Sequence, residues 1–66
     1  MCRSIKTLRG QEPPPTEEEI RAAALQFVRK VSGYRTPAVR NQVAFEMAVD
    51  EIADSSRRLL ETLVVR

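Results

Sequence analysis

The stretch that decides the fold runs from Thr16 to Gly33 and reads TEEEIRAAALQFVRKVSG. It opens on Thr16-Glu17-Glu18-Glu19, which has the spacing of a capping box. In that motif the Thr16 hydroxyl accepts a hydrogen bond from the Glu19 amide, and the Glu19 carboxylate accepts one from the Thr16 amide. Three glutamates in the first turn also stabilise the positive end of a helix dipole. The sequence therefore predicts that a helix begins at residue 17.

Apolar residues inside this stretch recur every three or four positions, which is the spacing of one helical face. They are Ile20, Ala23, Ala24, Phe27, Val28 and Val31. Arg29 and Lys30 follow in the expected last turn, where cations favour the negative end of the dipole. Gly33 is a typical left-handed stop. We therefore expect a first helix over residues 17–32.

A second apolar pattern follows the connector that contains Pro37, and no Gly or Pro interrupts it. Its members are Val43, Phe45, Ala48, Val49, Ile52, Ala53, Leu59, Leu60 and Leu63, with Ser56 as the only polar interruption. Thr36, with Pro37 as the first helical residue, and Asn41 are two candidate caps. The spacing predicts a second helix over about residues 40–64.

Acidic residues lie opposite this apolar stripe. Glu46, Asp50 and Asp54 are four residues apart and so align along the second helix, which would suit a divalent metal. Helical metal sites of this kind normally add histidine and are buried, so a solvated face is the expected interpretation. Asp54 also lies four residues before Arg58, a spacing that favours an ion pair.

The fold class that follows is all-α: an antiparallel two-helix hairpin over residues 16–66, preceded by an arm and a proline-rich linker over residues 1–15. We treat residues 1–66 as one small domain. At 1.5 Å per residue the helices would be about 24 Å and about 36 Å long, so the second has more apolar face than the first can cover. Either the arm covers the excess, anchored by Ile5 and Leu8, or a second copy completes a four-helix arrangement.

Composition excludes several classes of function. The chain has 66 residues, one Cys, no His and a net charge of +2. One thiol cannot form an internal disulfide, and without His neither an ordinary zinc site nor a catalytic triad can be assembled in one chain. No apolar run approaches the roughly 18 residues of a membrane span, and the start lacks the apolar segment of a signal peptide. We expect a cytoplasmic protein without a cofactor and without a membrane partner.

Cations gather in the arm and around the connector, where they could bind nucleic acid or another anion. They are Arg3, Lys6, Arg9, Arg29, Lys30, Arg35 and Arg40. Tyr34 lies among the connector residues and could stack on a base. The alternative is that Arg29 and Lys30 only stabilise a helix end while the arm pairs with acidic residues.

Cys2 is the one residue with the chemistry of a nucleophile. Removal of Met1 would place its thiol beside a free amine, which can act as a base, and nearby cations favour the thiolate. Ligation of a metal shared across a dimer is a second alternative. An incidental or structural thiol is the expected interpretation, because a chain this short leaves little room for a substrate pocket.

The opening Met1-Cys2-Arg3-Ser4-Ile5-Lys6-Thr7-Leu8-Arg9 resembles the start of a family of short bacterial proteins, the domain-of-unknown-function family 2277. The likeness extends to Pro13-Pro14, Thr16 to Leu25, Phe27 to Tyr34 and Arg57 to Leu60. The chain departs from the family pattern over residues 36–42, where Thr36-Pro37-Ala38 replaces a Lys-Pro-Ser turn. The resemblance implies an intracellular bacterial protein and brings no activity with it.

These observations favour a non-enzymatic helical interaction module that associates with itself or with a protein partner. A small nucleic-acid-binding protein that uses the arm and the connector arginines is the alternative. A thiol-dependent activity or metal ligation at Cys2 is a weaker one.

Overall fold

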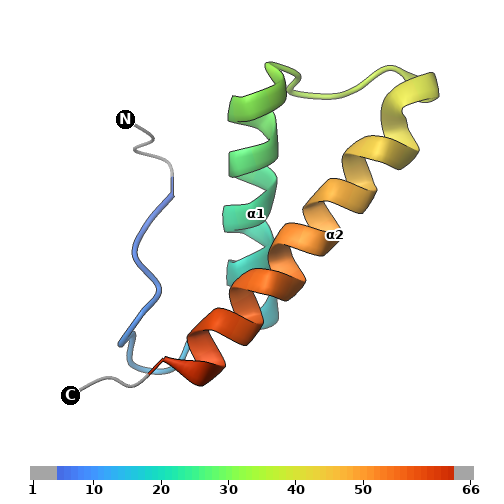
Figure 1. Ribbon diagram of the computed structural model, residues 1–66. Helices are drawn as coiled ribbons and strands as arrows, with labels where there is room; N and C mark the ends of the chain where they lie inside the picture. Colours follow the sequence, from blue (N-terminus) through green and yellow to red (C-terminus); the bar gives the residue numbers. More distant parts are fainter. Residues whose placement is uncertain (1–4, 64–66) are drawn as a thin grey trace.

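The computed structural model describes residues 5–63 and shows two antiparallel helices preceded by an extended arm (Figure 1). α1 spans Glu17–Ser32 and α2 spans Val39–Thr62. The described part of the chain contains no strand. The all-α hairpin predicted from the sequence is therefore confirmed. Leu63, which the prediction placed inside the second helix, is extended and forms the C-cap of α2, and residue 64 lies outside the described range.

Both ends of α1 are those that its sequence predicts. The Glu19 amide donates to Thr16 Oγ1 over 3.1 Å, and the Thr16 amide donates to Glu19 Oε1 over 2.9 Å. At the other end Gly33 adopts a left-handed φ of 80°, and its amide donates to the Arg29 carbonyl over 2.8 Å. A left-handed residue at this position turns the chain away from the helix axis, and this turn starts the connector.

α2 begins differently from the prediction. Its N-cap is Ala38, whose side chain cannot accept a hydrogen bond, so the first turn has no side-chain cap. The candidate caps Thr36 and Asn41 were both wrong. Thr36 lies two residues before the cap, and Asn41 is already helical, with its amide donating to the Ala38 carbonyl over 2.9 Å. The extended conformation of Ala38 after Pro37 sets the start of the helix at Val39.

The two helices pack against each other around a small buried core. The buried residues are Leu8, Ile20, Ala24, Val28, Val49 and Ala53. Only Val49 and Ala53 come from α2, and both lie in its middle. Ala24 and Ala53 are small, which lets the backbones approach closely. Away from this contact the helices diverge toward the connector, so the hairpin is open at that end (Figure 1).

The arm packs on α1, on the side away from the open part of α2 (Figure 1). Leu8 is buried as part of the core cluster, and it lines a shallow concavity with Ala22, Ala23 and Gln26 of α1. Ile5, the other predicted anchor, is half-buried. The arm therefore does not cover the N-terminal half of α2, next to the connector (Figure 1). The excess apolar surface of that helix stays exposed.

Candidate functional site

More large apolar side chains are exposed than buried in residues 5–63. The exposed ones are Phe27, Val31, Tyr34, Val39, Val43, Met47, Leu59 and Leu63. The buried core, by comparison, holds only four side chains larger than alanine. Exposed apolar residues that are scattered singly are ordinary, whereas a contiguous apolar patch larger than a few hundred Å² marks a contact site, so the placement of these side chains decides their meaning.

Five of these exposed side chains lie on one face of the hairpin. Where the helices diverge, Phe27, Val31 and Tyr34 meet Ala44 and Ala48 of α2 around a groove of about 310 Å³. Along α2 the stripe continues from Ala48 to Ile52 and Leu59, at steps of four and seven residues that keep one side of a helix, and Leu63 follows at the C-cap. We call the apolar face the set Phe27, Val31, Tyr34, Ala48, Ile52, Leu59 and Leu63.

The opposite face of the hairpin carries the ion pairs between the helices, together with the exposed Val39. Arg21 of α1 pairs with Asp50 of α2, and Arg57 Nε lies 3.7 Å from Glu17 Oε1. Arg21 lies six residues before Phe27 on α1, which places the two on widely separated sides of that helix. The two faces of one small hairpin thus have different chemistry.

Asp50, Asp54 and Glu61 of α2 are engaged by arginines. Asp54 pairs with Arg57 and, over 3.2 Å, with Arg58, while Arg57 Nη1 lies 3.6 Å from Glu61 Oε2. The predicted pairing of Asp54 with Arg58 is confirmed. Within residues 5–63 no group of acidic, His or Cys side chains is arranged to hold a metal ion.

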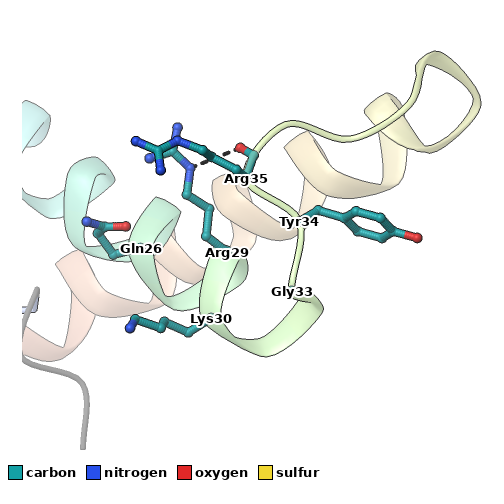
Figure 2. A pocket seen from close by; sticks show the side chains of 6 residues that line it. All are labelled: Gln26, Arg29, Lys30, Gly33, Tyr34 and Arg35. Atoms are coloured by element: carbon teal, nitrogen blue, oxygen red, sulfur yellow. Dashed lines mark hydrogen bonds between the residues drawn. The ribbon is translucent and has the colours of Figure 1, made fainter.

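A second concavity lies at the end of α1, around the connector. It has a volume of about 340 Å³ and is lined by Gln26, Arg29, Lys30, Gly33, Tyr34 and Arg35. Arg29 Nε donates to the Arg35 carbonyl over 3.2 Å, and the guanidinium groups of both arginines lie on the same side of the connector (Figure 2). No carboxylate lines this cavity. We call it the connector cavity.

Tyr34 and Lys30 point away from the two guanidinium groups (Figure 2). The Tyr34 ring extends to the other side of the connector, and this residue also lines the groove of the apolar face. Lys30 extends from the lower side of α1. Arg29 and Arg35 therefore share the connector cavity chiefly with Gln26, and Tyr34 belongs to the apolar face as much as to the cations.

The remaining predicted cations are dispersed. Lys6 Nζ lies 3.3 Å from Glu19 Oε2, so it pairs with α1 rather than joining the connector residues. Arg9 and Arg40 are exposed and form no ion pair with any residue between 5 and 63. Arg3 and Cys2 lie outside the described residues, so the hypotheses on the Cys2 thiol stay predictions.

Glu19 joins the arm to α1. Its carboxylate accepts from the Thr16 amide, from Gln11 Nε2 over 3.0 and 3.1 Å, and from Lys6 Nζ. The backbone hydrogen bond from Thr16, followed by those from Gln11 and Lys6, lowers the pKa of Glu19 below its ordinary value of 4.5. One carboxylate therefore caps the helix and holds the arm.

Reasoning from the sequence missed two features of these sites. The contact of Arg29 with the Arg35 carbonyl depends on the path of the chain after Gly33. The division of the hairpin into an apolar and an ion-paired face does have a signal in the sequence. Ala48, Ile52 and Leu59 share one side of the helix, while Asp50 and Arg57 share another.

The comparison with known proteins gives a family for the chain. The family model described as "Uncharacterized conserved protein (DUF2277)" matches residues 1–66. The chain belongs to the DUF2277 family. No curated protein and no solved structure matches this DUF2277 chain. Neither described helix of the DUF2277 protein is long and apolar enough to cross a membrane.

Proposed function

We propose that this DUF2277 protein is a non-enzymatic helical interaction module whose partner is a second copy of itself, bound through the apolar face. The observation that carries the proposal is the gathering of five of the eight exposed large apolar side chains on one face. Phe27 and Val31 of α1 line one groove with Ala48 of α2, and Leu59 follows Ala48 by eleven residues, a spacing that keeps the same side of a helix.

A second hairpin fits this surface in shape and in size. Two copies related by a two-fold axis would bring four helices around one apolar centre, the usual arrangement of helical bundles. The two helices present a flat face of roughly 600 Å² from their lengths and an interaxial spacing of about 10 Å. Stable interfaces bury about 800 Å² of accessible surface per partner, so the face is of the required order.

Sedimentation velocity on two matched variants tests the proposal. Val31 and Val43 have the same side chain and are 69% and 70% exposed, but only Val31 lines the apolar groove. Val31→Gln should weaken the dimer by about tenfold or more, because a polar amide would be buried in an apolar interface. Val43→Gln should leave the dimer unchanged. Gln carries no charge, so the helix dipole affects neither substitution.

Two results would contradict self-association. One is a wild-type protein that sediments as a strict monomer at all micromolar concentrations. The other is an equal effect of Val31→Gln and Val43→Gln on the dimer, because that would place the contact elsewhere. Circular dichroism on both variants should show unchanged helix content, since neither valine is in the buried core.

A further inference from the structure

We propose that the connector cavity binds a single phosphate group, held by the guanidinium groups of Arg29 and Arg35 with Gln26 beside them. The observation that carries this inference is the meeting of two arginines in one cavity that no carboxylate lines (Figure 2). The donors of the site, Arg29, Arg35 and Gln26, are not part of the apolar face, so the inference is independent of self-association.

The fold fixes one of the two arginines in advance. Gly33 ends α1 in a left-handed turn, and the connector then returns so that the Arg35 carbonyl lies 3.2 Å from Arg29 Nε. This hydrogen bond occupies one of the five N–H donors of the Arg29 guanidinium and leaves the four terminal ones free. Arg29 is also half-buried, so less side-chain freedom is lost when a ligand binds.

The charges around the cavity are unbalanced. All the ion pairs within residues 5–63 use Lys6, Arg21, Arg57 or Arg58. Arg29 and Arg35 take part in none of them, although like charges placed together repel each other. An anion between the two guanidinium groups removes that repulsion. Glu46 lines the neighbouring groove with both arginines but pairs with neither.

The chemistry of the donors favours a phosphate group. Guanidinium groups bind phosphate through two parallel hydrogen bonds, and the Gln26 amide adds a neutral donor one turn before Arg29. A cavity of about 340 Å³ is at the small end of the range for small-molecule sites. A nucleic acid would need further phosphate contacts along a basic track, whereas the other cations are dispersed or paired with acids. The ligand is therefore a small phosphate-bearing molecule.

Titration of the full chain with inorganic phosphate at low ionic strength tests this site. Amide and arginine Nε NMR signals of residues 29–36 should shift and saturate. Arg35→Gln should weaken binding by about tenfold, the usual worth of one charge-assisted hydrogen bond. Its side chain donates no hydrogen bond within the described residues, so the variant should fold normally. Arg40→Gln is the matched control, because Arg40 is an exposed arginine outside the cavity.

Glu46→Gln gives a test of opposite sign. Removal of this carboxylate from the neighbouring groove should tighten phosphate binding by about twofold to fivefold, the size of one exposed charge interaction. Equal weakening by Arg40→Gln and Arg35→Gln would overturn the site. So would shifts spread over all basic residues. If a single-stranded oligonucleotide bound more tightly than phosphate, with a steep salt dependence, the ligand would be a nucleic acid and the proposal of a small ligand would be wrong.

Discussion

Glu19 combines two roles that proteins usually give to separate residues. Its carboxylate completes the capping box with the Thr16 amide and also accepts from Gln11 and Lys6 of the arm. These hydrogen bonds all favour the charged form of the carboxyl, and they explain why its pKa is lowered. The position of the arm is therefore coupled to the protonation of one side chain.

Acidification should release the arm from α1. The pKa of Glu19 is lower in the folded protein than the ordinary 4.5. The Glu19 carboxylate therefore contributes its full stabilisation at every pH above that ordinary value. That contribution is lost as the pH falls through the lowered pKa. NMR signals of the Leu8 methyl groups, which report the buried position of the arm, should move toward exposed values over this acid range.

The Glu19→Gln variant is the control for this titration. Gln can still accept from the Thr16 amide, so α1 keeps most of its cap, but the side chain no longer titrates. The Leu8 signals of the variant should lack the part of the pH dependence that Glu19 causes. Identical titration curves for the two proteins would show that another acid holds the arm.

At the scale of the elements, the two helices begin very differently. α1 has a reciprocal cap and three glutamates in its first turn. α2 has Ala38 at its cap and no acidic residue in its first turn. The longer helix thus leaves its first amides without a side-chain partner. Its start relies on Pro37 and the connector instead of a capping side chain.

A capping side chain at residue 38 should stabilise the protein. Ala38→Asp is expected to raise the free energy of unfolding by about 1 kcal/mol, because the carboxylate accepts from an amide of the first turn and favours the helix dipole. Urea denaturation measures the change. Thr16→Ala, which removes the side-chain cap of α1, is the comparison and should lower the free energy of unfolding by about 1 kcal/mol. A destabilised Ala38→Asp protein would contradict the assigned helix start.

The difference between the two starts also explains how well the sequence predicts each helix. The bounds of α1 follow from residues that lie within four positions of each other, such as Thr16 with Glu19 and Arg29 with Gly33. The start of α2 has no such local pair. Thr36 and Asn41 both look suitable as caps by themselves. The path of the connector, which depends on how the helices pack, selects Ala38 instead.

At the scale of the whole molecule, the sequence predicts which surfaces exist better than how they are placed. The burial of Leu8 follows from its apolar character in a polar arm, and the excess apolar surface of α2 follows from helix length. The contact between α1 and α2 near Ala24 and Ala53, and the divergence beyond it, depend on three-dimensional packing. The meeting of Arg29 and Arg35 depends on the same geometry, so spacing alone cannot give it.

A dimer of this hairpin should be more heat-stable when it is more concentrated. Association that occurs only in the folded state stabilises that state by mass action, so Tm should rise with protein concentration from the low to the high micromolar range. Differential scanning calorimetry measures this shift. The Val31→Gln protein should have a Tm that depends little on concentration. A wild-type Tm that is independent of concentration would argue that folding does not depend on a partner.

The division of the hairpin into an apolar and an ion-paired face has a consequence for its response to sodium chloride. The pairs of Arg21 with Asp50 and of Arg57 with Glu17 are between exposed side chains. Such pairs are screened when the Debye length falls from about 10 Å at 0.1 M to about 3 Å at 1 M salt. In the proposed dimer, burial of Phe27 and Leu59 would depend on the exclusion of water, which salt of this kind does not weaken. High salinity should therefore loosen the link between the two helices on one face and leave the attraction between the apolar faces of the proposed dimer intact.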